Sequence, residues 1–270
     1  ESNNSEAPIF IRPWGIVREQ LEATLESAGV HVTEVALLGD SMRLAAPTSL
    51  ADVAAFRDGL FFVQDPGATL VSRYAAIPDH AIVADLCAAP GGKALELART
   101  ARLVVAADRS STRLRRLLEN TARLDAANVV AMVADARLPA LREVDVVLLD
   151  VPCTGTGTFR RHPDARWRLK VSDLAVMGAV QRQMLRAAMA LVRPGGLLVY
   201  STCSLEPEEN DSQVESFLQE FPDWKLEPPP AGAVPEGVLD AGRLRVLPHR
   251  HGVDGAFAAR LRRSGGGGAS

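Results

Sequence analysis

The stretch "IVADLCAAPGGKALELA", residues 82–98, joins an aliphatic run to a turn of small residues and then to a helical pattern. A short apolar run bounded by such a turn predicts a buried strand. Glycines in the turn let the backbone approach a ligand closely, and the start of the following helix favours negative charge. The turn matches neither the G-x-G-x-x-G fingerprint nor a Walker A loop, which disfavours NAD and ATP.

The same alternation continues along the chain. The aliphatic runs "LVVAAD", "VVAMVAD", "VDVVLLD" and "LLVYSTC" each predict a strand, and 243–261 predicts a closing pair. Helical patterns cover 110–124 and 172–192, the second closed by "RPGG", and a third follows the acidic turn "LEPEEND". Strands and helices in alternation are typical of a mostly parallel sheet with helices on both faces, so we predict an α/β fold.

Residues 1–75 show a different pattern, with a helix near 15–28 and short strands near 30–46. We predict a small α/β extension there, a main domain over 76–263 and a flexible tail over 264–270, "SGGGGAS". The chain begins with Glu rather than Met, which favours a cut from a longer protein.

Composition narrows the class of protein. The net charge is −3, so any anionic partner must meet a local basic patch rather than a basic protein. The chain has only three cysteines, a small and odd number that argues against a disulfide scaffold. It favours a protein of the reducing cytosol. No apolar run approaches the ~18 residues that span a bilayer. We therefore expect a cytoplasmic protein without a membrane segment, and a monomer.

Four successive strands carry an aspartate where they end: Asp85, Asp108, Asp135 and Asp150. Aspartates also cap turns, but ligands of open α/β sheets lie at this end of the strands. Asp108 follows Asp85 by 23 residues, a spacing that suits hydrogen bonds to ribose hydroxyls. With Lys93 and the helix start available to a carboxylate, this set outlines an adenosine with an amino-acid end, S-adenosylmethionine. The predicted cofactor residues are Cys87, Ala88, Ala89, Pro90, Gly91, Gly92, Lys93, Asp108, Arg113, Asp135 and Asp150.

Two cysteines follow strands in "VPCTGTG", residues 151–157, and "YSTCS", residues 200–204. A thiolate at a ligand-binding edge can act as a nucleophile, whereas a buried thiol is often only a small apolar side chain. We interpret Cys87, which lies among alanines, as such a small buried side chain. The flanking residues make neither Cys153 nor Cys203 more acidic, so the sequence pattern leaves the attacking thiol open.

The blocks "DLCAAPGGK", "DVPCTGTG" and "STCSLEPEEN" resemble the signature blocks of the Sun/RsmB family of RNA 5-methylcytosine methyltransferases, and the likeness covers nearly the whole chain. The resemblance implies a Rossmann-like class I methyltransferase domain with a mostly parallel seven-stranded sheet, preceded by a small RNA-contacting extension. It also implies methylation of cytosine carbon 5. It assigns nucleophilic attack to Cys203, product release to Cys153 and proton donation to the base to Asp150.

The segment "FRRHPDARWRLK", residues 159–170, concentrates positive charge directly after the first cysteine turn. Phosphate contacts and stacking rings are what single-stranded RNA recognition needs, although a solvated loop would carry the same residues. The predicted RNA-binding residues are Arg160, Arg161, Arg166, Trp167, Arg168 and Lys170, with Arg12 and Arg18 as further candidates for the patch.

The resemblance favours 16S rRNA as the substrate. The alternatives are the same chemistry on tRNA, or a non-catalytic RNA-binding factor in ribosome assembly. Two intact candidate thiols argue against the latter. His249 and His251 have no cysteine or acid at ligand spacing nearby, so we expect no metal site.

Overall fold

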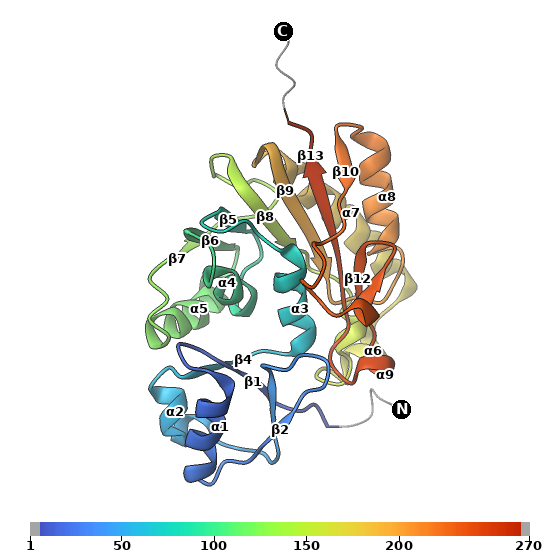
Figure 1. Ribbon diagram of the computed structural model, residues 1–270. Coiled ribbons are helices and arrows are strands. Elements are labelled where there is room, and N and C mark those ends of the chain that lie inside the picture. The colour runs from blue at the N-terminus through green and yellow to red at the C-terminus, as the bar shows by residue number, and fades with distance from the viewer. Residues whose placement is uncertain (1–5, 266–270) are drawn as a thin grey trace.

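The computed structural model describes residues 6–265, which form a small antiparallel sheet and a large mixed sheet (Figure 1). The centre of the large sheet consists of parallel strands in the order β7 (Val129–Val133), β6 (Leu103–Asp108), β5 (Ile82–Asp85), β8 (Val144–Asp150) and β9 (Val192–Thr202). These strands are nearly continuous apolar runs, as expected for strands covered on both faces.

Antiparallel strands complete the large sheet beyond β9. β13 (Ala256–Arg263) pairs with β9, β12 (Arg243–Val246) pairs with β13, and the short strands β11 (Leu239–Asp240) and β10 (Trp224–Leu226) pair with β12 and β13. The expected α/β class and closing strand pair are confirmed. Within residues 6–265 the sheet has nine strands rather than seven, because β10 and β11 add short edges.

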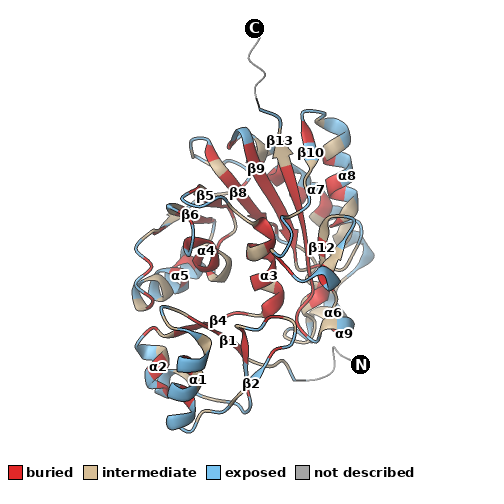
Figure 2. Cartoon of the chain, viewed as in Figure 1, coloured by how far each residue is buried: buried red, intermediate tan, exposed pale blue. Residues whose placement is uncertain are grey.

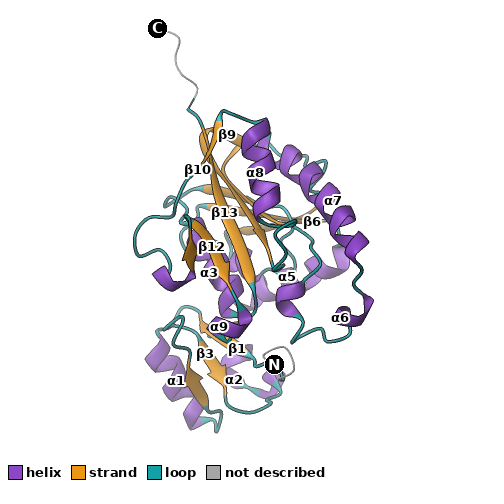
Figure 3. Ribbon diagram, turned by 90° about the vertical axis from the view of Figure 1, so that its right-hand side faces the viewer, coloured by secondary structure: helices purple, strands orange, loops and turns teal. Residues whose placement is uncertain are grey.

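Helices cover both faces of this sheet. α3 (Pro66–Ala75), α4 (Gly92–Ala98) and α5 (Ser111–Arg123) contribute to one apolar cluster, and α7 (Val171–Met189) and α8 (Asp211–Glu220) to another. Figure 3 shows α7 and α8 together on one side of the strands, and Figure 2 shows the buried residues concentrated in the central strands. The remaining helices are single turns: η3 (Thr156–Thr158), α6 (Ala165–Arg168), η4 (Glu236–Val238) and α9 (Pro248–His251).

Two local expectations were wrong. The "RPGG" stretch does not close a helix, because α7 ends at Met189 and these residues already belong to β9. Asp135 does not end a strand, because β7 stops at Val133 and Asp135 lies in the following turn. In that turn its carboxylate accepts the backbone N–H of Arg137 at 2.9 Å.

The small sheet has the strand order β2–β3–β1–β4 and its own core. Its elements are β1 (Phe10–Pro13), α1 (Arg18–Ser27), β2 (Val32–Glu34), β3 (Met42–Leu44), η2 (Leu50–Asp52), α2 (Ala54–Arg57) and β4 (Phe61–Val63). Leu21 and Leu25, one turn apart on α1, are fully buried against Ile11, Met42 and Phe61. Apolar residues at this spacing explain why the segment folds as an amphipathic helix on a sheet.

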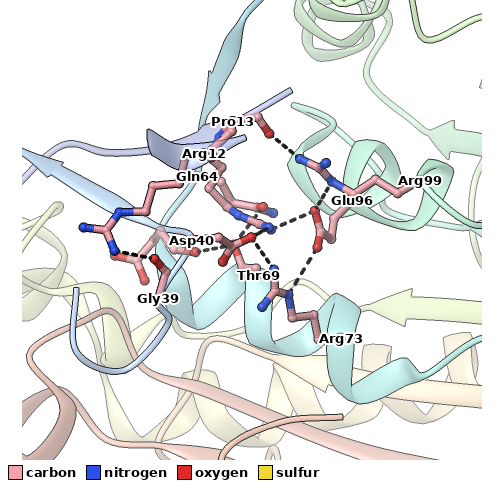
Figure 4. Close-up of polar contacts among 11 residues, drawn as sticks. Arg12, Pro13, Gly39, Asp40, Gln64, Thr69, Arg73, Glu96 and Arg99 are labelled. Carbon is pink, nitrogen blue, oxygen red and sulfur yellow. Dashed lines mark hydrogen bonds and ion pairs between the residues drawn. The ribbon is translucent and has the colours of Figure 1, made fainter. Parts of the chain in front are cut away.

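A network of charged residues joins the small sheet to the large domain (Figure 4). Arg12 of β1 is only 1% exposed and pairs with Asp40 at 2.5 Å and with Glu96 of α4 at 2.7 Å. Arg73 of α3 contacts the same two acids, and Arg99 contacts Glu96 and the carbonyl of Pro13. The suggestion that Arg12 extends an RNA patch is therefore wrong, because its guanidinium lies inside this seam.

The proposed division at residue 75 remains a prediction. α3, which that division assigns to the extension, contributes Leu70, Val71 and Tyr74 to the apolar cluster of the large sheet. Among residues 6–265, no helix has the length and apolarity needed to cross a membrane.

Candidate active site

The candidate site lies at the carboxyl ends of the parallel strands. β5, β6 and β8 end at Asp85, Asp108 and Asp150, as expected from the sequence. Because the strands are parallel, these ends meet at one edge of the sheet. The residues that follow them belong to the turns that carry Cys87 and Cys153.

The structure brings the two candidate thiols together. Cys153 follows β8 and Cys203 follows β9, and these strands are neighbours in the sheet. The two sulfur atoms are 3.2 Å apart, and both cysteines are free. Two thiols separated by 50 residues in the sequence can therefore act on one substrate.

A lysine and an aspartate lie beside the thiols. The Nζ atom of Lys93 is 2.8 Å from Oδ2 of Asp150, and the hydroxyl of Ser201 donates to Oδ1 of the same carboxylate at 2.7 Å. Burial opposes the charge on Lys93, but the Asp150 carboxylate outweighs it and raises the pKa of Lys93. We therefore treat Lys93 as a fixed positive charge in the site.

The surroundings of the two thiols differ. The hydrogen bond between Cys153 and Cys203 and the charge of Lys93 lower the pKa of Cys203, against the effects of burial and Asp150. The same hydrogen bond, together with burial and the charge of Glu209, raises the pKa of Cys153. The thiolate, not the thiol, is the nucleophilic form of cysteine. A lowered pKa is what an attacking thiol needs, so the direction of the shift agrees with the assignment of attack to Cys203.

A cavity of about 550 Å³ opens beside β5, β6 and β8. Its lining includes the predicted cofactor residues Cys87, Ala89, Asp108, Arg113, Asp135 and Asp150. It also includes residues that the sequence pattern did not indicate: Arg109, Ser110, Arg137, Met177, Val180 and Met184. Met177, Val180 and Met184 belong to α7. The sequence could not predict their position, because it does not show which face of that distant helix borders the cavity.

The other predicted cofactor residues lie around a second cavity of about 510 Å³. Ala88, Pro90, Gly92 and Lys93 line it together with Phe10, Phe62 and Gln64, while Asp85, Cys87, Ala89 and Asp150 line it as well. Gly91 is not in either lining. Its φ of 112° requires glycine, and a Cβ there would lie 2.9 Å from Leu117.

The strand-end acids carry different partners. Asp108 accepts from the guanidinium of Arg113 at 2.7 Å and from two backbone N–H groups. Asp85 is 1% exposed, and within the described residues neither of its carboxylate oxygens has a hydrogen-bond partner. Burial and the nearby Asp150 raise the pKa of Asp85 to about 7. A buried acceptor without a donor suits a ligand that supplies one, such as the ammonium of an amino-acid end. The residues present therefore fit S-adenosylmethionine.

The basic segment 159–170 divides into two groups. Arg161 is paired with Asp65 at 2.8 Å and with Asp254, and Arg160 lies 3.6 Å from Asp254. These two arginines thus hold the segment against the rest of the protein.

The remaining predicted RNA residues lie toward the surface. Trp167 is 85% exposed, and Arg168 and Lys170 are also exposed. Arg166 lies over the ring of Phe159, with its guanidinium carbon 5.8 Å from the ring centroid. A surface groove beside them is lined by Arg161, His162, Arg168 and Leu169, among others. The exposed group is the part of the segment that can meet RNA.

Sequence reasoning missed three buried polar residues beside the thiols: Gln181, Glu209 and Asn210. Glu209 and Asn210 belong to the block "STCSLEPEEN", so their position in that block was visible. The partner of Glu209 on the Cys153 turn, Thr154, was not, because it lies 55 residues earlier in the chain.

Comparison with known proteins identifies the family. Residues 75–262 match the model of the 16S rRNA methyltransferase RsmB/F family. A ribosomal RNA small subunit methyltransferase B from Vibrio cholerae is 39% identical over 97% of this chain, and the chain spans 60% of that relative. The solved structure PH0851 superposes with a TM-score of 0.89 at 34% identity, covering 97% of this chain and 61% of that one.

A structure of NSun6 from Pyrococcus horikoshii, solved with SFG, has a TM-score of 0.84 at 24% identity and covers 97% of this chain and 92% of its own. It supports the expected Rossmann-like methyltransferase fold. S-adenosylmethionine is the cofactor of this methyltransferase domain. Since the family match covers most of the sequence, the chain belongs to the 16S rRNA methyltransferase RsmB/F family.

Proposed function

We propose that this chain methylates carbon 5 of a cytosine in RNA, with 16S rRNA as the substrate, through a covalent adduct on Cys203. The observation that carries the proposal is the pair of free thiols 3.2 Å apart beside the Lys93–Asp150 pair. The family and the name of the Vibrio cholerae relative support rRNA as the substrate.

The cofactor residues have separate tasks in this proposal. Asp85 and the turn of residues 87–93 would hold the amino-acid end of S-adenosylmethionine, and Asp108 and Asp135 the nucleoside end. When bound, the cofactor supplies a methyl group on a positively charged sulfur. Lys93 and Asp150 border the second cavity, which extends toward the small sheet and is where the target base would enter after leaving its stack.

Covalent addition makes the base reactive. Carbon 5 of cytosine is a poor nucleophile until a group adds to carbon 6. The Cys203 thiolate forms a bond to carbon 6 as electrons move into the ring, and Asp150, which would carry a proton when the base is bound, donates it at ring nitrogen 3. Carbon 5 then has enamine character and would take the methyl group from the sulfonium sulfur, which keeps the electron pair of the broken bond and leaves as a neutral thioether. Lys93 supports this step because its positive charge stabilises the Cys203 thiolate beforehand.

Release reverses the addition. The proton on carbon 5 leaves to a base, the ring double bond re-forms, and the bond between carbon 6 and sulfur breaks with its electron pair on sulfur. The proton at ring nitrogen 3 returns to Asp150. Cys153 lies 3.2 Å from the departing sulfur and can donate its S–H hydrogen to the returning thiolate. This contact supports product release as the role of Cys153.

The two cysteine variants test the proposal. With labelled S-adenosylmethionine and 16S rRNA fragments, we expect Cys203→Ala to lose methyl transfer completely while still binding the cofactor. We expect Cys153→Ala to accumulate a protein–RNA adduct that survives a denaturing gel. Ordinary turnover by Cys203→Ala would exclude Cys203 as the nucleophile, and an adduct in that variant would reverse the roles of the two thiols.

Bisulfite mapping of RNA from cells with and without the gene tests the substrate, because it shows whether the methylated base lies in 16S rRNA or in tRNA.

A further inference from the structure

Two adjacent polar residues lie buried between β9 and α8. Glu209 is 0% exposed and Asn210 is 1% exposed. Neither is a candidate to touch the base or the cofactor, since neither lines either of the two cavities beside the strand ends. Their side chains nevertheless contact the turns that carry both thiols.

Glu209 holds the turn of Cys153. Its carboxylate accepts the backbone N–H of Thr154 at 3.0 Å and also accepts the hydroxyl of that threonine. It accepts the side-chain amide of Gln181 at 2.9 Å, and the same amide donates to the carbonyl of Pro152 at 3.0 Å. The residues on both sides of Cys153 are thereby fixed.

Asn210 does the same for Cys203. Its Oδ1 accepts the hydroxyl of Thr202 at 2.6 Å, and its Nδ2 donates to the carbonyl of Ser204 at 2.9 Å. The backbone N–H of Ser204 also donates to the Thr202 hydroxyl at 3.1 Å. Thr202 and Ser204 flank Cys203, so its turn is closed from both sides.

Packing alone does not explain why a charged side chain occupies position 209. Within the described residues its carboxylate is bound by neutral donors and by no cation. Burying an acid in this way is costly, and a neutral amide could fill the same space. The charge acts on the Cys153 thiol and on the Tyr200 hydroxyl, and it helps to raise the pKa of both. Lys93 and Asp150 act instead on Cys203.

We propose that Glu209 and Asn210 are positioning residues that divide the work of the two thiols. Glu209 holds the turn of Cys153 in place for product release and sets a negative charge beside it, while Asn210 holds Cys203 in the position from which it attacks. This inference rests on the two-thiol reaction proposed above, and it explains why the two residues are adjacent: one short turn sets the separation of both sulfur atoms.

A matched pair of glutamate variants tests the role of the charge. Glu209→Gln keeps the size and an acceptor oxygen but removes the charge, whereas Glu208→Gln changes the exposed neighbour. We measure iodoacetamide labelling of each cysteine by mass spectrometry across a pH series in the RNA-free protein. We expect Glu209→Gln to label Cys153 about tenfold faster near pH 8, because loss of the neighbouring negative charge favours the thiolate, with Glu208→Gln unchanged. Equal labelling of Cys153 in the two variants overturns the proposal.

Adduct kinetics test the division of work. We expect Glu209→Gln to form the RNA adduct at the normal rate but to release it about tenfold more slowly, as Cys153→Ala does. We expect Asn210→Ala to form the adduct about tenfold or more slowly without accumulating it, because a small misplacement of a reacting atom has an effect of this size or larger. If both variants slow both steps equally and lower the melting temperature together, the role is only structural.

A variant on the Thr154 side of the contact between Thr154 and Glu209 provides a test that does not depend on how Glu209→Gln folds. Thr154→Ala removes the hydroxyl that donates to Glu209 and leaves the carboxylate in place. We expect it to slow release in the same manner, and the double variant with Glu209→Gln to be less than additive. If the wild-type protein and Cys153→Ala both form no RNA adduct, the proposed function fails, while the labelling of Cys153 still decides whether Glu209 controls that thiol.

Discussion

At the scale of single residues, Asp85 links cofactor binding to stability. It is buried without a hydrogen-bond partner among the described residues, and its pKa is raised to about 7 by burial and by Asp150. In the unfolded chain its pKa returns to about 3.9. Because the folded value is the higher one, its stabilising contribution is complete below about pH 3.9 and is lost as the pH rises through 7.

This difference predicts how Asp85→Asn behaves. Between about pH 5 and about pH 8, we expect the wild-type free energy of unfolding to fall by on the order of 2 kcal/mol more than that of the variant, because only the wild type deprotonates a buried acid there. Urea unfolding of the cofactor-free proteins at the two pH values measures this. Parallel pH profiles for the two proteins would show that Asp85 is already ionised in the folded state.

Much of the site at this scale could be predicted from the sequence. Asp85, Asp108, Asp150, Cys153 and Cys203 each follow a recognisable strand, so their common edge follows from the fold class. Which thiol is the more acidic could not be predicted from the sequence pattern, because it depends first on the contact between the two thiols and then on burial and on charges that include Lys93 and Glu209. Only folding brings those side chains beside the sulfur atoms.

At the scale of elements, the segment 159–170 combines two tasks that composition cannot separate. Five cations fall within twelve residues, but Arg160 and Arg161 are directed at Asp254 and Asp65. Such acidic partners lie about 90 residues away in the sequence, on other elements. The exposed Trp167 of α6 is therefore a better candidate for direct RNA contact than the arginines nearest to the thiols.

We expect Trp167→Ala to raise the Kd for a single-stranded 16S rRNA fragment about tenfold, since stacking of a base on an aromatic ring contributes ~1–3 kcal/mol. Stability should be unaffected because the ring is 85% exposed. Leu138→Ala is the matched control, because Leu138 is 83% exposed on a different surface loop. Fluorescence anisotropy measures both Kd values. If the two variants bind equally well, Trp167 does not stack on RNA.

At the scale of the whole molecule, the two sheets are held together by buried charge as well as by apolar contact. Glu96 of α4 lies 2.7 Å from Arg12 of β1 and 2.8 Å from Arg99, and it also faces Arg73 (Figure 4). These arginines outweigh the effect of burial and lower the pKa of Glu96, so the carboxylate is ionised. The second cavity is lined from both sheets, by Phe10 and Phe62 on one side and Lys93 on the other. Its shape therefore depends on this seam.

Removing one member of the network should be costly, because it leaves Arg12 buried with a single partner. We expect Glu96→Gln to lower the free energy of unfolding by about 3–5 kcal/mol, the usual result of breaking a buried ion pair. Glu220→Gln, which breaks the exposed pair with Arg186, should change it little, because exposed pairs contribute little. Urea unfolding monitored by tryptophan fluorescence measures both, since Trp14 lies in the small-sheet region and Trp224 in the large sheet. Coincident losses of stability in the two variants would mean that apolar packing alone joins the sheets. A broadened transition confined to Glu96→Gln would show that the two parts separate before they unfold.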